Sequence, residues 1–218
     1  LIVIHQSINK KKVNLKKKKK LISFVGKLNS AKGYDIFGKT IIKILNKYPD
    51  WSANVIGDEP REEFNFNHKK LNLLGFKKHK EVLLNFEKTS IAVVCSRWNE
   101  PFGRTSLEAS SRGCGVIISN RGGLPETITN GIILKDLSIK SLFMEIENLI
   151  KNQKLLKKLQ IESLKNFKLN DHFISKKIDE CRSNNLRSIV NINKKTDLKN
   201  LKILHVTNFN ERHNGRLF

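Results

Sequence analysis

Short apolar segments alternate with amphipathic segments along most of this sequence, and this alternation constrains the fold more than any other feature. Each apolar segment is only four to six residues long, which fits a strand buried on both faces. The predicted strands are residues 1–4, 21–26, 52–57, 71–75, 91–95, 115–119 and 131–134. Such strands pair in parallel and need helices on both faces of the sheet. The predicted fold class is therefore α/β, a doubly wound, Rossmann-like parallel sheet.

The segments between the strands have the helical spacing that this fold requires. Residues 34–48 have apolar side chains at positions 36, 37, 41, 44, 45 and 48, which fall on one face of a helix. Further helices are predicted around 79–88, from Gly103 onward, and near 138–150, 153–166 and 171–187. Ligands of a doubly wound sheet bind outside the carboxyl ends of its strands. A site is therefore expected among the residues that follow the strands, at 26–33, 57–60, 75–76 and 95–104.

Length and cysteine content describe a globular chain with one full domain. The 218 residues are enough for a substantial core, and 39% of them are hydrophobic. No apolar run is long enough to span a bilayer, and no signal peptide is predicted. Cys95, Cys114 and Cys181 have no CxxC spacing and cannot all pair. Reduced, buried cysteines and a cytoplasmic location are expected.

The chain is strongly basic, with a formal net charge of +22 from 33 lysines and nine arginines against 20 acids. Eight of the lysines lie in residues 10–20. Specific nucleic-acid recognition favours arginine and interleaved aromatic residues, which do not cluster here, so no specific nucleic-acid partner is expected. A solvated lysine surface and peripheral contact with the inner face of an anionic membrane are both open interpretations.

The segment GKLNSAKG, residues 26–33, follows a predicted strand and has glycine at both ends. Lys27 and Lys32 can converge on one diphosphate, because lysine is a point charge suited to phosphate and glycine lets the backbone approach a ligand. The segment is not a Walker A loop, because GxxxxGK[ST] is absent. Ordinary surface lysines in a lysine-rich chain are the alternative.

The segment NEPFGRTSLEAS, residues 99–110, places Glu100 and Glu108 on either side of a Pro-Phe-Gly turn. Gly103 is predicted to begin a helix, whose first N–H groups favour an anion. Glu108 lies about one and a half turns inside and can face the same cleft as Glu100. Because a carboxylate can accept two hydrogen bonds from a vicinal diol, the pair fits a ligand with sugar on both sides of a diphosphate. A surface helix that happens to contain glutamate is the alternative.

Five motifs occur together in a fixed order: GKLNSAKG, VIGDE, LLGF, EPFGRTSLE and NRGGLPE. They cover about residues 21–187 and resemble the carboxyl-terminal, donor-binding half of retaining GT-B glycosyltransferases, a large bacterial family with a Glu-x7-Glu motif. The resemblance implies transfer of a hexose-type sugar from a nucleotide diphosphate sugar, with retention of configuration, toward a cell-envelope polysaccharide. It also implies that no metal or other cofactor is needed, and the sequence has no D-x-D metal motif.

By this resemblance, Lys27 and Lys32 clamp the donor diphosphate. Lysine stands at position 27 where the family usually has arginine, so the charge is kept but the bidentate fork is lost. Glu100 contacts hydroxyls of the transferred sugar, and Glu108 binds the nucleoside ribose. Catalytic roles fall to Glu100, Lys32 and Lys27, because the leaving diphosphate is stabilised electrostatically and accepts the proton of the acceptor.

The other donor-binding residues implied by the resemblance are Gly26, Gly75, Phe76, Phe102, Gly103, Arg104 and Thr105. Backbone N–H groups around Phe102 and Gly103 would hold sugar or phosphate. Gly75 and Phe76 would lie against the base, with packing of Phe76 into the core favoured over stacking. The glycine pair at 122–123 is expected to form a tight turn beside the pocket.

The ends of the chain suggest further parts. Residues 1–20 are interpreted as a crossover strand and a lysine-rich loop, residues 21–187 as the nucleotide-sugar-binding domain, and residues 188–200 as a linker. Residues 201–218 resemble the first strand of a second glycosyltransferase domain, with a strand that completes the first domain as the alternative. Because a GT-B enzyme works between two domains, residues 1–218 alone are expected to bind donor without transferring sugar. The glycan or lipid-linked acceptor would be bound by an amino-terminal domain outside this sequence.

Two other functions are open at the level of sequence. One is a non-catalytic module that binds a nucleotide sugar or phosphate. The other is a basic adaptor for a membrane or nucleic acid, built on a Rossmann-like scaffold. Binding of UDP, GDP or ADP would support a glycosyltransferase or the non-catalytic module, whereas salt-sensitive DNA binding would support the adaptor.

Overall fold

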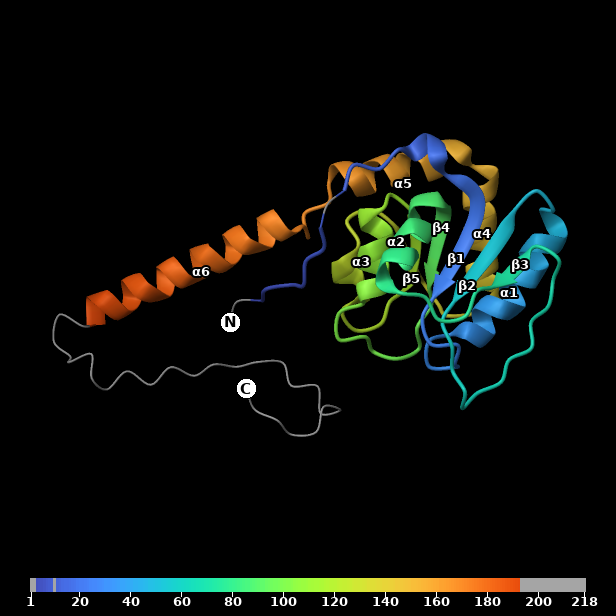
Figure 1. Cartoon of the computed structure of the whole chain (residues 1–218), viewed down its shortest axis with the longest axis horizontal. Coiled ribbons are helices and arrows are strands. Elements are labelled where there is room, and N and C mark those ends of the chain that lie inside the picture. The colour runs from blue at the N-terminus through green and yellow to red at the C-terminus, as the bar shows by residue number, and fades with distance from the viewer. Residues whose placement is uncertain (1–2, 10, 193–218) are drawn as a thin grey trace. The chain divides into compact units, whose positions relative to one another are not determined.

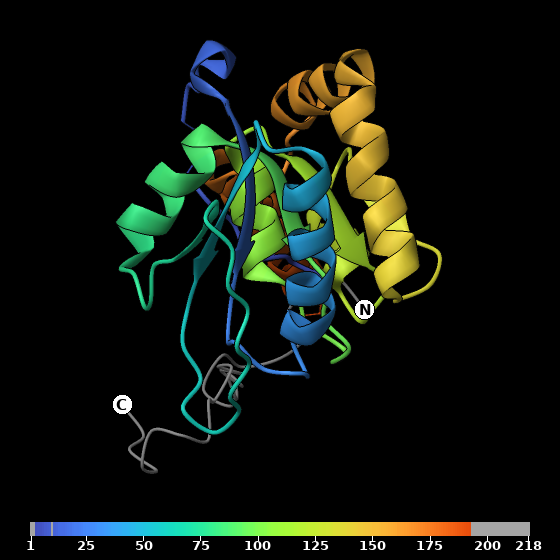
Figure 2. The same cartoon turned by 90° about the vertical axis from the view of Figure 1, so that its right-hand side faces the viewer.

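A computed structural model describes residues 3–9 and 11–192, and these residues form one six-stranded parallel sheet with helices on both faces (Figures 1 and 2). The strands are β1 (Lys19–Val25), β2 (Ser52–Ile56), β3 (Leu71–Leu73), β4 (Thr89–Val94), β5 (Gly115–Ser119) and β6 (Ile132–Leu134). Their order is β3-β2-β1-β4-β5-β6, and every neighbouring pair is parallel. The predicted doubly wound, Rossmann-like fold is confirmed.

The helices lie where the apolar spacing predicts them, within a few residues. They are α1 (Tyr34–Lys47), α2 (His79–Lys88), α3 (Arg104–Ser111), α4 (Ile139–Lys151), α5 (Gln153–Lys165) and α6 (Asp171–Ile192), with 3-10 turns η1 (Leu15–Lys17) and η2 (Leu124–Thr127). The sheet belongs to the first of two compact units, which spans Leu1–Lys177.

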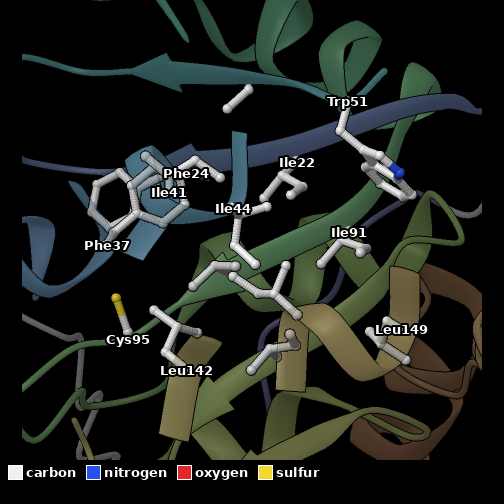
Figure 3. Close-up of a cluster of buried hydrophobic side chains, with 14 of the residues drawn as sticks. Ile22, Phe24, Phe37, Ile41, Ile44, Trp51, Ile91, Cys95, Leu142 and Leu149 are labelled. Carbon is white, nitrogen blue, oxygen red and sulfur yellow. The ribbon is translucent and has the colours of Figure 1, made fainter. Parts of the chain in front are cut away.

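Two cores cover the two faces of the sheet, because successive strand residues point in opposite directions. Ile91 of β4 belongs to the core that α1 and α4 cover, together with Phe37 and Leu142 (Figure 3). Ala92, the next residue of β4, belongs to the other core, which includes Phe86 of α2 and residues of α3. Central strands buried on both faces explain why the apolar runs in the sequence are continuous rather than alternating.

The lysine-rich loop before β1 contains the 3-10 turn η1 and is fastened to the rest of the domain by one of its lysines. The Lys18 ammonium donates to the carbonyl oxygens of Phe86 and Arg112, both at 2.8 Å, and contacts the Cys114 sulfur at 3.5 Å. These carbonyls lie at the carboxyl-terminal ends of α2 and α3, where a cation is favourable. Burial lowers the pKa of Lys18 below its ordinary value. Lys18 therefore fastens the start of β1 to two helices.

Four predictions for the chain ends and cysteines need correction or lie outside the described residues. Val3 and Ile4 are not in a strand, and residues 188–192 continue α6 instead of forming a linker. Because residues 183–192 contain no proline or glycine, no local signal ends the helix there. The predicted strand within 201–218 lies outside the described residues. Cys95 and Cys114 are buried as expected, but Cys181 is only half-buried.

None of the helices within the described ranges is both long and apolar enough to cross a membrane.

Candidate functional site

Two helices begin side by side at the carboxyl edge of the sheet. β1 and β4 are neighbours, although the chain leaves β1 toward β2 and returns from β3, so the strand order reverses between them. Doubly wound sheets bind their ligands at this point. α1 begins after Gly33 and α3 after Gly103, and no side chain of the described residues caps either helix. The N–H groups of the first turn of α3 are therefore available to an anion, whereas the Tyr34 N–H that begins α1 already donates to the Asn29 carbonyl oxygen at 3.1 Å.

Glycine is required at both helix starts. Gly33 has a φ of 74° and Gly103 a φ of 100°, in the left-handed region that glycine adopts without a steric penalty. A Cβ on Gly33 would overlap the carbonyl oxygen of Cys95, and a Cβ on Gly103 would lie 2.5 Å from a methyl carbon of Leu124. These two glycines let both helices start close against neighbouring structure.

A cavity of about 330 Å³ lies at this edge of the sheet. The ends of β1 and β4 contribute to its lining, together with Gln6 from the amino-terminal segment. Seven of the predicted donor-binding residues line it: Gly26, Lys32, Glu100, Phe102, Gly103, Arg104 and Thr105. Lys27, Gly75, Phe76 and Glu108 do not line it. The structure therefore brings most of the predicted site into one cavity and places the rest outside its lining.

Lys32 and Glu100 face each other in this cavity. The Lys32 ammonium lies 2.5 Å from Oε1 of Glu100, and only 12% of the Glu100 side chain is exposed. The backbone of Glu100 is held by Gly123, whose N–H donates to the Glu100 carbonyl oxygen at 2.7 Å. A Cβ on Gly122 would overlap that same oxygen, which accounts for the glycine pair and confirms the predicted turn beside the pocket. A cation and a carboxylate are thus presented together to a ligand.

Glu108 is buried beside the cavity and lies between the side chains of His79 and Arg104. Its Oε1 is 3.1 Å from Nε2 of His79 and 3.5 Å from Nε of Arg104. Arg104 also lines the cavity, so it connects Glu108 to the predicted anion site. His79, the first residue of α2, was missed by the sequence analysis. Its one signal in the sequence is its position shortly after the LLGF motif.

The loop 26–33 is fixed by residues that the sequence analysis did not select. The Arg97 guanidinium donates to both carboxylate oxygens of Asp35, at 2.6 and 2.7 Å, and to the Ser30 carbonyl oxygen at 2.5 Å. The hydrogen bond from Arg97 lowers the pKa of Asp35. The Glu62 carboxylate accepts the Ser30 N–H at 2.9 Å. Both Arg97 and Glu62 are far from this loop in the sequence, so neither the composition nor the periodicity of 26–33 indicates them.

Gly75 and Phe76, which are predicted to lie against the nucleotide base, are exposed. Phe76 is 72% exposed, so its predicted packing into the core is wrong. β3 is a three-residue edge strand, and Gly75 follows it with a φ of 64°, which carries Phe76 beyond the helices that cover the sheet. The Gly75 carbonyl oxygen accepts the N–H of Gly57 at 2.9 Å. Lys27 is likewise exposed. Phe76 and Lys27 are therefore open to a ligand rather than used by the fold.

The amino-terminal segment closes one side of the cavity, a contribution that the sequence analysis missed. Gln6 lines the cavity, and the His5 ring lies 5.6 Å from that of Phe102. His5 Nε2 is also 2.7 Å from Glu126 Oε2. Within residues 3–9 and 11–192, no group of three or more His, Cys, Asp and Glu side chains is arranged to hold a metal ion.

A parallel sheet with a lysine, a carboxylate and an uncapped helix start at its point of reversal defines a Rossmann-like domain suited to an anionic, hydroxylated ligand. The family model for glycosyl transferases group 1 matches residues 5–165. The chain therefore belongs to this family, whose domain is of GT-B type, and this much of the predicted resemblance is confirmed.

Similar proteins support this assignment. The chain is 34% identical over 134 residues to spore coat protein SA of Bacillus subtilis, a match that covers 54% of this chain and 36% of that protein. It spans about a third of the length of the curated relatives it matches. The C-terminal domain of the glycosyl transferase group 1 family protein LpcC from Francisella tularensis is 29% identical, with a TM-score of 0.60 over 66% of this chain and 82% of that one. Anabaena HepE, solved with UDP and glucose, shares the fold at 19% identity, with a TM-score of 0.64 over 76% of this chain and 48% of that one.

Proposed function

We propose that this domain binds the nucleotide diphosphate sugar of a retaining glycosyltransferase, and that the transferred sugar is of hexose type. The observation that carries the proposal is the Lys32–Glu100 pair at 2.5 Å in the cavity at the uncapped start of α3. A diphosphate matches the ammonium and the N–H groups, and sugar hydroxyls match the carboxylate. HepE, which shares this fold, was also solved with UDP-glucose, a donor of this chemistry.

Each residue then has a defined role in donor binding. Lys32 and the first turn of α3 would neutralise the diphosphate, with Lys27 adding charge from the exposed side of the loop. Glu100, when Lys32 turns to phosphate, would accept hydrogen bonds from hydroxyls of the transferred sugar. Glu108 would accept hydrogen bonds from the ribose and would be oriented by His79 and Arg104. These cationic groups and helix dipoles supply the charge compensation, so we propose that the donor is held without a metal.

The reaction that this arrangement serves is a transfer on one face of the sugar. The bond between the anomeric carbon and a diphosphate oxygen breaks, and the acceptor oxygen bonds to that carbon on the same face. The acceptor hydroxyl gives its proton to the leaving diphosphate. Lys32 and the start of α3 stabilise the negative charge that develops on the diphosphate, which is the main catalytic contribution of this domain. We further propose that a second domain binds the acceptor, which is a glycan or a lipid-linked molecule, and that the product belongs to the cell envelope. The free cysteines support a reducing, cytoplasmic compartment.

Calorimetric titration with UDP, GDP and ADP tests this function. We expect one of the three to bind, and we expect Glu108→Gln to weaken it by about 1.5–3 kcal/mol, the range for hydrogen bonds to a charged group. Glu147→Gln is the matched control, because Glu147 is also a partly buried, ion-paired glutamate but lies on α4. Absence of binding by all three nucleotides would contradict the function, and equal losses in the two variants would contradict the ribose assignment.

Glu100→Ala separates sugar recognition from nucleotide recognition. Because Glu100 is assigned to the transferred sugar, the variant should bind the nucleoside diphosphate as the parent does. Its preference among sugars on the same nucleotide should become weaker. Unchanged sugar preferences would remove Glu100 from this role.

A further inference from the structure

A second hollow, of about 340 Å³, lies at the opposite end of the sheet from the Lys32–Glu100 cavity. It is formed by the start of β1, by Trp51 before β2, by Ser90 at the start of β4, and by α5. Because the strands are parallel, their amino ends share this edge. β1 has seven residues, so the two edges are separated by about 20 Å at about 3.3 Å per residue.

Lysine dominates this hollow. Five lysines line it, namely Lys16, Lys18, Lys19, Lys20 and Lys157, and none of the described lining residues is acidic. η1 and α5, which supply the first and last of these lysines, lie at the same end of the sheet in both views (Figures 1 and 2). Segments far apart in the sequence therefore build one basic surface.

Only some of these charges are used by the fold. Lys18 is held by backbone carbonyls, and Lys20 pairs with Asp50 at 2.6 Å. Lys16, Lys19 and Lys157 of the hollow are exposed, as is Lys17, which lies beside it in η1, and across the described residues these four lysines take part in no ion pair. We call these four residues the amino-edge lysines. Their charge is not compensated within this part of the protein, so an anionic partner would gain from binding here.

We propose that the amino-edge lysines bind the phosphate headgroups of an anionic membrane surface. Lysine attracts such headgroups by charge without a fixed geometry, which suits a fluid layer of lipids. A single-stranded nucleic acid would need exposed aromatic rings for stacking. Trp51 in the hollow is only 2% exposed, and the exposed aromatic residues of the described chain, Phe76, Trp98 and Phe173, belong to other elements.

This geometry separates membrane contact from the cavity at the carboxyl edge. The distance of about 20 Å exceeds the Debye length of about 8 Å at physiological salt, so a charge at one edge has little effect on the other. With the amino edge on the membrane, the cavity faces away from the lipid and stays accessible from water. The inference does not depend on which ligand the cavity binds.

Co-sedimentation of the full chain with vesicles tests the inference. Vesicles of phosphatidylcholine alone are compared with vesicles that also contain phosphatidylglycerol. The variant replaces all four amino-edge lysines by glutamine and should bind the anionic vesicles on the order of 100-fold more weakly than the parent. The matched control replaces four other exposed lysines without an ion pair, namely Lys39, Lys43, Lys135 and Lys140, and so removes the same charge.

The outcomes separate a built surface from general basicity. The inference predicts a much smaller loss for the control variant, no binding to phosphatidylcholine alone, and parental thermal unfolding for both variants. Equal losses in the two variants would overturn it, because net charge alone would then explain binding. Binding of duplex RNA that depends on the amino-edge lysines, without binding of anionic vesicles, would overturn it in favour of a nucleic-acid surface. Binding of inorganic phosphate alone, without vesicles, would overturn it as well.

Discussion

The free backbone groups at the two ends of α3 have different roles, because one end faces a cavity and the other is hydrogen-bonded within the fold. At the amino-terminal end, the helix begins at Gly103 without a side-chain cap and opens onto the Lys32–Glu100 cavity. At the carboxyl-terminal end, the Arg112 carbonyl oxygen accepts a hydrogen bond from the buried Lys18 ammonium at 2.8 Å.

Lys18 and Lys32 differ in how many of their ammonium donors the fold already uses. Lys18 has three partners and is held by the fold, whereas within the described residues Lys32 pairs with one carboxylate, that of Glu100, on the cavity wall. A lysine ammonium has three donors, so Lys18 is saturated and Lys32 can still bind a ligand. The saturated Lys18 ammonium therefore stabilises the domain, whereas the Lys32 ammonium has donors left for a ligand.

The largest expected effect comes from the glycine that begins α1. Gly33→Ala places a Cβ against the Cys95 carbonyl oxygen at a φ of 74°, so the backbone must move. We expect a loss of about 3–5 kcal/mol in the free energy of unfolding, measured by urea denaturation. Gly75→Ala is the control, because its φ is 64° but no described atom lies within 4 Å of the new Cβ. That variant should lose only about 1 kcal/mol, and equal losses would mean that close packing at Gly33 is unimportant.

The next effect tests the role of Lys18 as a structural cation. Lys18→Met keeps the length of the side chain but leaves the carbonyl oxygens of Phe86 and Arg112 without their donor. We expect a loss of about 2–3 kcal/mol in the free energy of unfolding. Lys17→Met, at an exposed neighbour, should change it by less than about 0.5 kcal/mol. Equal stability of the Lys18 and Lys17 variants would contradict the structural role of Lys18.

A binding comparison of the two lysines in the loop 26–33 sharpens the contrast further. Lys32 lines the cavity and Lys27 does not, so Lys32→Ala should weaken nucleoside diphosphate binding by about 1.5–2 kcal/mol and Lys27→Ala by less. Neither should affect binding of the bare nucleoside, and the double variant should be non-additive because both lysines act on one diphosphate. Equal loss for nucleoside and nucleoside diphosphate, measured by calorimetry, would mean that the loop does not bind phosphate.

The smallest effect concerns the Arg97–Asp35 pair that holds this loop. Asp35 has a lowered pKa in the folded state, so the unfolded state binds more protons in the acid range and stability rises with pH there. This contribution is present above the unfolded pKa and is lost as pH falls through the folded pKa. Asp35→Asn should cost about 0.5–1 kcal/mol at neutral pH and should flatten the loss of stability as pH falls below the ordinary aspartate pKa of about 3.9. An unchanged pH dependence in urea denaturation would contradict it.

The fold was almost fully predictable because its signal is local and repeated. Each buried strand, such as 115–119, is a continuous apolar run, and α1 has a clear helical spacing. Two parts of the chain differ from the prediction, each for a physical reason. Phe76 follows a short edge strand, where an apolar residue has no covering helix, and residues 188–192 lack any helix-ending residue.

The site was predictable only where chemistry and a motif coincide. Lys32 and Glu100 belong to recognisable segments, and the cavity contains both. Arg97 and His79 act through contacts with Asp35 and Glu108, across 62 residues in the first case, and only the folded chain brings such partners together. Lys18 looks in the sequence like any of its lysine neighbours, because its burial depends on where α2 and α3 end.

The difference between the two edges is tested most directly by hydrogen exchange of the chain with and without UDP, GDP and ADP. We predict that the nucleotide that binds slows exchange at residues 26–33 and 100–106, where the loop with Lys32 and the uncapped start of α3 lie, and leaves residues 15–20 and 153–160 unchanged. Slowed exchange at the amino edge, or no change at the carboxyl edge with any of the three nucleotides, would contradict the assignment of the donor site to the carboxyl edge.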